Sequence, residues 1–273
     1  MELVQLRRCV TTLLVAAPML LGAPCAAADD GDEALQKKLA NPVSDLITLP
    51  MQFTSTRHVG PFERPQHTLN IQPVYPSQLG GGWSLIHRLI LPVLSNPAAA
   101  PGQERENGLG DIVYEGFFSP APSGGVIWGA GPMLQMRTAS DERLGSGKWS
   151  AGPAVVALQQ EGRWSLGALV TQLWSFTGAD DRANVNQMQI QPIINYRLDA
   201  QHAIAYTGTI VANWKQDSSN RWTVPLGATY SILTKPAGFV PVNYIFGGGY
   251  NVVRPDFTGD WFVRLQANFI LTK

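Results

Sequence analysis

The sequence predicts an all-β fold, a transmembrane antiparallel up-and-down β-barrel of about 12 strands. Segments that alternate between apolar and polar residues recur from Pro42 to Lys273, and stretches rich in Gly, Pro, Asn, Asp or Ser separate them. Trp, Tyr and Phe recur at the segment ends, and no later segment has the roughly 20 apolar residues that a membrane helix needs. The strands are expected, within about two to four residues, at 45–57, 66–77, 81–93, 109–119, 124–137, 147–160, 162–176, 184–198, 202–215, 221–234, 239–252 and 260–272.

The N-terminus predicts a signal peptide over residues 1–28. Arg7 and Arg8 form a basic start, an apolar run covers 11–21, and small residues place the cleavage near Ala28. A lipid anchor on Cys25 is an alternative, although the preceding Pro24 fits a lipidation site poorly. The mature chain is therefore expected to begin near residue 29 and to be exported.

Cysteine content and charge exclude several functions. Cys9 and Cys25 are the two cysteines and both lie in the predicted signal peptide, so no disulfide or cysteine metal site is expected in the mature chain. The formal net charge is zero, and loss of Glu2, Arg7 and Arg8 leaves it near minus one. No basic stripe is present, so nucleic acid is not an expected partner, and no cofactor is implied.

Three segments show the two faces of the expected strands most clearly. Residues 185–198 set an apolar face against an amide-rich one, and residues 222–232 and 240–252 set apolar and aromatic residues against Gly, Ser, Thr and Asn. Alternation alone does not say which face is inside. Strand length and aromatics near the segment ends favour a membrane barrel with a wet or narrow lumen. The expected interface aromatics are Trp222, Tyr230, Tyr244 and Tyr250.

The connections predict the orientation of the barrel. Outer-membrane barrels have short periplasmic turns and longer external loops, which would place both termini in the periplasm. The last strand departs from the usual pattern because Phe269 lies four residues before the terminal Lys273, although the barrel assembly machinery usually favours a terminal aromatic residue. Tight connections near Gly80, Gly162 and Ala200 alternate with longer ones at 95–109, 138–147 and 178–184.

The chain divides into the signal peptide, a periplasmic N-terminal segment at 29–44, and the barrel at 45–273. A weak helical pattern covers Glu33 to Leu39. Two alternatives remain for this segment, a disordered tail or a partial plug that folds into the lumen.

No catalytic or metal site is expected. The four histidines lack metal-ligand spacing, no Gly-x-Ser-x-Gly is present, and no His and Ser pair lies in a motif. Carboxylates in the predicted external loops are of the type that holds calcium or the divalent ions of lipopolysaccharide, but their spacing matches no calcium motif and solvated loop charges are the simpler interpretation. These carboxylates are Asp141, Glu142, Asp180 and Asp181.

Polar residues that the alternation places inward are the candidate lining of a pore. Rings of charge and amides set pore selectivity, although the same residues in a closed network of salt bridges would seal a structural barrel. The candidates are Arg88, Glu115, Gln135, Arg137, Gln187, Gln189, Gln191, Asn195, Arg197, Arg264 and Gln266.

Several stretches resemble a bacterial outer-membrane transporter family labelled putative MetA-pathway of phenol degradation, some of whose members are misnamed neuromedin U. The matching residues are 41–47, 68–74, 107–112, 144–149 and 152–153. The resemblance implies a membrane barrel that moves small, often hydrophobic or aromatic, molecules, and it supplies no catalytic residues.

Three hypotheses follow. The first is a porin-like channel or transporter for small molecules in the bacterial outer membrane. The second is a structural or surface-binding barrel without an open pore, in contact with outer-membrane lipids and lipopolysaccharide. The third is an outer-membrane lipid hydrolase.

Overall fold

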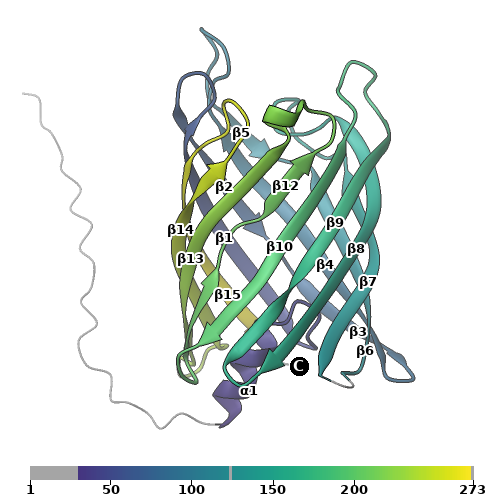
Figure 1. Cartoon of the computed structure of the whole chain (residues 1–273), viewed down its shortest axis with the longest axis vertical. Helices are drawn as coiled ribbons and strands as arrows, with labels where there is room; N and C mark the ends of the chain where they lie inside the picture. Colours follow the sequence, from purple (N-terminus) through teal and green to yellow (C-terminus); the bar gives the residue numbers. More distant parts are fainter. Residues whose placement is uncertain (1–29, 123–124, 272–273) are drawn as a thin grey trace, which may run out of the picture.

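The computed structural model describes residues 30–122 and 125–271. It is a closed antiparallel barrel of twelve strands, as the sequence predicts (Figure 1). The predicted signal peptide, both cysteines and the cleavage site lie outside the described residues. Among the described residues no helix is long and apolar enough to cross a membrane.

The barrel strands follow one another around the wall in chain order, each antiparallel to the next. Their bounds fall within a few residues of the predicted segments. The first half consists of β1 (Ile47–Val59), β2 (Arg64–Ile71), β3 (Val74–Gly80), β4 (Trp83–Asn96), β5 (Glu106–Leu109), β6 (Ile112–Pro120), β7 (Val126–Met136) and β8 (Lys148–Glu161). The second half consists of β9 (Trp164–Gly178), β10 (Asn186–Arg197), β11 (His202–Tyr206), β12 (Ile210–Asn213), β13 (Trp222–Thr234), β14 (Val242–Val253) and β15 (Trp261–Leu271), with the 3-10 turn η1 (Ser218–Asn220) between β12 and β13.

Pairing of the first and last strands closes the barrel. Their register runs from Ile47 opposite Leu271 to Thr56 opposite Phe262. Closure pairs the backbone groups of both strands and leaves no sheet edge, which a barrel in lipid requires.

Three of the twelve predicted strands are each interrupted once. The break between β2 and β3 contains Pro73, the break between β5 and β6 contains Gly110, and the break between β11 and β12 contains Gly208. Both halves of each of these strands pair with a common neighbour, so each pair of short strands occupies one position in the wall. The twelve positions therefore arise from fifteen short and long strands.

The two ends of the barrel differ in their connections. Short turns join β3 to β4, β8 to β9 and β10 to β11 at the end that also holds α1 (Asp30–Leu39), and we call this the α1 mouth. The longer loops at 97–105, 137–147 and 214–221 gather at the opposite end, the loop mouth (Figure 1). Short connections at one mouth and longer loops at the other are the arrangement that the sequence predicts, and the periplasmic position of the α1 mouth stays a prediction.

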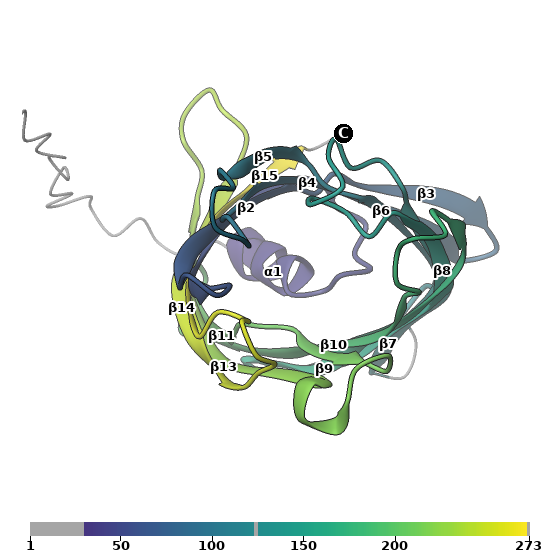
Figure 2. The same cartoon turned by 90° about the horizontal axis from the view of Figure 1, so that it is seen from above.

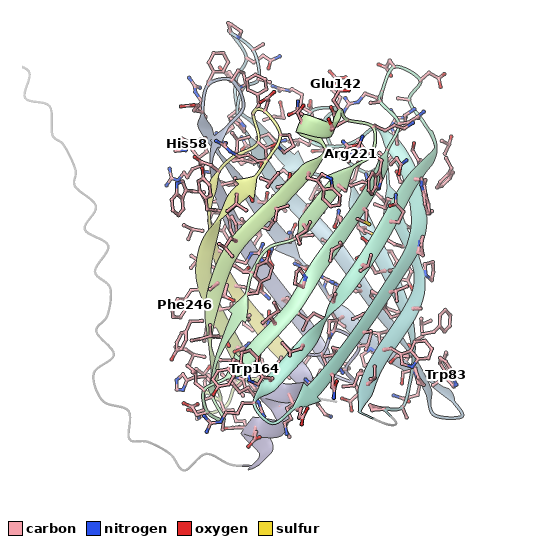
Figure 3. All side chains as sticks on the ribbon, in the orientation of Figure 1. His58, Trp83, Glu142, Trp164, Arg221 and Phe246 are labelled. Carbon is pink, nitrogen blue, oxygen red and sulfur yellow. The ribbon has the colours of Figure 1, made fainter. Side chains whose placement is uncertain are left out.

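Aromatic pairs lie on the outer wall near both mouths. The ring centres of Trp164 and Tyr196 are 4.7 Å apart near the α1 mouth. The ring centres of Tyr250 and Trp261 are 5.0 Å apart near the loop mouth. Figure 3 shows Trp83 and Trp164 at the α1 end and Arg221, the residue before Trp222, at the other. Of the other predicted interface aromatics, Tyr230 contacts Phe246 and Tyr244 is exposed, and Trp222 packs edge-on against Trp214.

Seen from above, the helix α1 falls within the ring of strands (Figure 2), and in Figure 1 it lies at the end of the barrel and extends below the strands. It is a short polar helix, and the chain leads from it along the inside of the barrel to β1. The segment at 30–39 is thus a helix at the α1 mouth.

Candidate functional site

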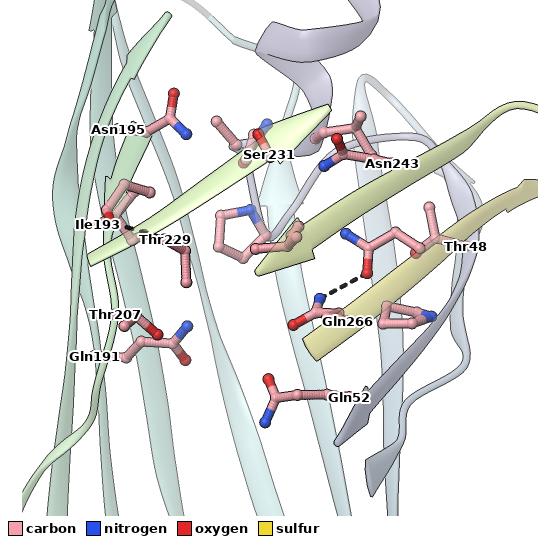
Figure 4. A pocket seen from close by; sticks show the side chains of 18 of the residues that line it. Thr48, Gln52, Gln191, Ile193, Asn195, Thr207, Thr229, Ser231, Asn243 and Gln266 are labelled. Carbon is pink, nitrogen blue, oxygen red and sulfur yellow. Dashed lines mark hydrogen bonds between the residues drawn. The ribbon is translucent and has the colours of Figure 1, made fainter. Parts of the chain in front are cut away.

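The lumen contains two cavities of about 280 and 270 Å³. The first lies against α1 and the second extends toward the loop mouth. Five polar side chains line both cavities and so mark the level at which they meet. We call these five the girdle: Gln52, Gln72, Arg88, Gln191 and Arg264. Figure 4 shows Gln52 and Gln191 projecting toward each other from opposite walls.

Arg88 is held by two neighbours in the girdle. Its guanidinium donates to Glu115 Oε2 at 3.2 Å and to Gln72 Oε1 at 2.7 Å. The Glu115 side chain is almost fully buried, so the ion pair neutralises a carboxylate that would be costly to leave alone away from water. Arg88 therefore adds little net charge to the lumen.

Arg264 is the unpaired cation of the girdle. Its Nη1 donates to Thr207 Oγ1 at 2.7 Å, and its guanidinium lies 5.8 Å from the centre of the Phe262 ring. Among the described residues no carboxylate forms an ion pair with Arg264, and its Nε has no hydrogen-bond partner. The girdle therefore carries a net positive charge at this side chain.

The inner wall has two chemically different parts. Most of the residues of β1 and β13 to β15 that line the first cavity are polar, although Pro50 and Ile245 also line it. We call the polar set Gln52, Thr229, Ser231, Asn243, Arg264, Gln266 and Asn268 the polar arc. Apolar inward residues of β4 and β6 to β9, together with Ile193 of β10, form one packed cluster with Val43, whereas the other inward residues of β10 are amides and Arg197. We call this cluster the apolar arc: Ile86, Phe117, Met133, Ala154, Val156, Leu158, Leu169, Leu173 and Ile193.

The structure brings seven of the eleven predicted lumen residues into the two cavities. They are Arg88, Glu115, Gln189, Gln191, Asn195, Arg264 and Gln266. The other four lie elsewhere. Gln135 donates to Asp111 and Ser146 near the loop mouth, Gln187 lies in β10 beyond the cavities, Arg137 is exposed past the end of β7, and Arg197 is buried beside α1.

Sequence reasoning missed Gln52 and Gln72. Gln52 lies in the first strand opposite Gln266, so the antiparallel register of the closing strands places both on the same face. Gln72 lies after β2, at the break that contains Pro73. The alternation of inward and outward residues is interrupted there, so it does not predict which way Gln72 points. The register of β1 against β15 was the signal available for Gln52.

Side chains of the barrel wall hold α1 in its mouth. Arg197 donates to Glu33 Oε1 at 2.9 Å, Lys235 forms an ion pair with the buried Asp32, and Gln36 donates to the carbonyl of Gln201 at 2.8 Å. The Arg197 contact, helped by Lys37, lowers the pKa of the Glu33 carboxyl below its ordinary value. The helix is thus attached to several strands by charged and polar contacts.

A third cavity of about 530 Å³ lies among the loops at the loop mouth. Arg143 pairs with both Glu106 and Asp141, and the latter contact measures 3.4 Å. Asp141 is therefore engaged with an arginine, and among the described residues no group of three potential metal ligands is found. Asp181 and Glu142 also line this cavity.

One serine and one histidine face each other on the outer wall. Ser55 of β1 lies directly opposite His67 of β2, on the same side as the exposed Phe53. Ser55 Oγ and His67 Nδ1 both lack a hydrogen-bond partner among the described residues, and no bond links the two side chains. His67 instead stacks against Phe53 at 5.8 Å.

No family model matches the chain, and no curated protein matches it by sequence. A solved structure shares its fold. The COG4313 outer membrane channel from Pseudomonas putida F1 matches with a TM-score of 0.57 and 13% identity, over 84% of this chain and 97% of that chain. Outer membrane phospholipase A from Escherichia coli matches with a TM-score of 0.44 and 11% identity, over 89% of this chain and 98% of that chain. The chain is therefore similar in fold to an outer membrane channel.

Proposed function

We propose that this chain is a passive channel for small solutes in the outer membrane of a Gram-negative bacterium. The observation that carries the proposal is the pair of lumen cavities that meet at a polar girdle. A structural barrel needs no polar cavities along its axis. Amide side chains and a guanidinium replace part of the hydration shell of a passing solute, which is how pore linings select what they conduct.

The unpaired charge of Arg264 supports a preference for anions. Two unit charges 4 Å apart attract by about 1 kcal/mol in water, which corresponds to about a fivefold preference. The cargo proposed on this basis is a small anion, including the aromatic carboxylates that agree with the family the sequence resembles. No catalytic step is part of the proposal.

The reversal potential in a potassium chloride gradient tests this function. We expect refolded wild-type protein in planar bilayers to show discrete channels that favour chloride. Arg264→Gln should lose most of that preference, because the girdle then has no unpaired cation. Arg254→Gln is the matched control, since Arg254 lies in the β14–β15 loop and donates to the carbonyl of Thr258.

Two results would overturn the proposal. A correctly folded barrel that gives no channel steps would favour the closed structural barrel, for which the position of α1 in the mouth is the supporting observation. Equal chloride preference in wild type and Arg264→Gln would show that Arg264 does not determine the anion selectivity of the pore.

Lipid hydrolysis is a second candidate, for which Ser55 and His67 are the residues to test because they lie opposite each other on the lipid-facing wall. A nucleophilic serine needs a base within hydrogen-bond reach, and in this structure the two side chains are not hydrogen-bonded. Turnover of a phospholipid ester by the purified protein, lost in Ser55→Ala and retained in Ser95→Ala on β4, would establish this activity. Absence of turnover with folded protein would dismiss it.

A further inference from the structure

The barrel wall is incomplete between β10 and the strand formed by β11 and β12. Residues 195–197 of β10 pair with β11, and residues 187–190 pair with β12, in one continuous register. The four intervening pairs, residues 191–194 with 206–209, are missing from the ladder. In Figure 1 this stretch is the coil that joins β12 to β11 between β10 and β13.

The sequence explains why the ladder fails at this level. Pro192 has no backbone N–H to donate, and it faces Gly208 in the interrupted register. Gly208 adopts a φ of 135°, outside the range of an extended strand, and it packs against Pro225 of β13. Thr207 N still donates to the carbonyl of Gly227 at 3.1 Å. The coil therefore stays with β13 and leaves β10.

The cavity next to α1 reaches into this gap. Along β13, β14, β15 and β1 only alternate residues line it, as expected for a wall with one face inward. Along β10 every residue from Gln191 to Asn195 lines it, and so do Ala205, Tyr206 and Thr207 on the other side. Contact with consecutive residues on both sides indicates that the cavity reaches the level of the missing ladder.

The chemistry of the gap is amphipathic. Its outward residues include Pro192 and the exposed Ile194, and Ile193 lies on its inner side (Figure 4). Thr207 marks the inner edge of the gap, and this is the residue that accepts the hydrogen bond from Arg264. A cation therefore lies at the inner end of a passage whose outer end is apolar.

We propose that this gap is a lateral portal through which amphipathic monoanions leave the lumen for the membrane interior. The carboxylate binds Arg264, and the apolar body of the molecule passes between Ile193 and the coil at 206–209. The proposal rests on the proposed channel function and adds a second exit to it, one that small hydrophilic anions do not use.

A reversible tether across the gap tests the portal. The pair Ile194→Cys and Tyr206→Cys places two thiols on opposite sides of the missing ladder, in a chain that has no other cysteine after residue 25. A short bis-methanethiosulfonate reagent joins them, and a reductant releases them. The control pair Ile190→Cys and Ile210→Cys is joined in the same way, because these partly exposed residues already pair on the same two strands.

Two probes separate the portal from the channel. The first is the uptake rate of radiolabelled decanoate by cells that express the protein and lack another outer-membrane route for fatty acids. The second is chloride conductance of the same protein in planar bilayers. We expect the tether at 194 and 206 to reduce decanoate uptake to the rate of cells without the protein, and to leave chloride conductance unchanged. Reduction should restore the uptake, and the control tether should change neither quantity.

Each contrary result has a separate meaning. Unchanged decanoate uptake after tethering, with chloride conductance present, overturns the portal and leaves the channel. Equal loss of decanoate uptake and chloride conductance also overturns it, because the tether then blocks the axial lumen. Absence of chloride conductance in the untethered protein overturns the channel function on which the portal depends.

Discussion

The polar arc and the apolar arc occupy the same barrel but have different roles. Val156 and Ala154 of the apolar arc are completely buried, although they point toward the lumen. Gln266 of the polar arc lines an open cavity. One part of the inner wall is therefore mostly a packed core like that of a soluble protein, although its Met133, Leu169 and Ile193 also line the cavities. The other part mainly bounds the solvent-accessible space. Packed and cavity-lining residues are thus unevenly distributed around one closed sheet.

The apolar arc also explains why β8 shows no clean alternation in its sequence. Its burial alternates regularly, with Ala154, Val156 and Leu158 inward and Val155 and Ala157 outward. Both faces are apolar, because one packs against the core and the other faces lipid. Periodicity in polarity is lost where both environments are apolar.

The largest expected effect is the loss of a large side chain from the apolar arc. Phe117 is 1% exposed, and truncation of such a phenylalanine costs about 3–5 kcal/mol through lost contacts and the cavity left behind. We expect Phe117→Ala to lower the free energy of unfolding by this amount, measured by urea titration in lipid vesicles.

The neighbouring Phe118 is the matched control because it faces outward and is 43% exposed. Phe118→Ala leaves a space that lipid fills, so its cost should be clearly smaller. Equal costs for the two variants would show that the apolar arc is not a packed core and would break the distinction between the arcs.

A smaller effect is expected in the polar arc. Gln266 donates to Asn268 Oδ1 at 2.6 Å and lines the cavity against α1. Gln266→Leu keeps the approximate size of the side chain but removes an amide that solvates passing ions. A passing ion then loses one hydrogen bond from the wall, worth about 1 kcal/mol. We therefore expect the single-channel conductance to fall about fivefold.

The conductance of Leu265→Ala should remain that of wild type, because Leu265 is 53% exposed on the outer wall of the same strand. Unchanged conductance in Gln266→Leu would show that the polar arc does not bound the conducting path. A large decrease in the free energy of unfolding of that variant would show that the polar arc also stabilises the folded barrel.

The sequence predicts the twelve strand positions because each strand meets lipid on one face, and that environment imposes a regular period. The lumen is less predictable, since its residues contact partners on strands distant in sequence. The alternation of side chains along β10 is enough to place Gln187 and Arg197 on the same face as Gln191. It does not show that Arg197 binds α1, because that contact spans 164 residues. The sequence shows only that Pro192 lies within a strand. It does not show the gap in the ladder, because the gap also depends on the contact of Gly208 with Pro225 of another strand.

The smallest expected effect concerns α1, which bridges the two arcs. Gln160 of β8 donates to the carbonyl of Lys37 at 2.8 Å, and Lys235 beyond β13 pairs with Asp32. Only part of this attachment depends on Glu33. Because the pKa of the Glu33 carboxyl is lowered in the folded protein, its contribution is present above the ordinary value of 4.5 and is lost as the pH falls through the lowered value.

We therefore expect α1 to stay docked from neutral pH down to about the ordinary pKa of a glutamate, and to loosen partly below it. Spin labels on Ala34→Cys of α1 and Glu161→Cys of β8, measured by double electron–electron resonance, report the docking distance. The distance distribution should broaden in acid for this protein. In the Glu33→Gln background it should be equally broad at every pH, because the charged partner of Arg197 is absent. A distribution that stays narrow in acid in both backgrounds would show that the hydrogen bonds of Gln36 and Gln160 suffice to hold the helix between the two arcs.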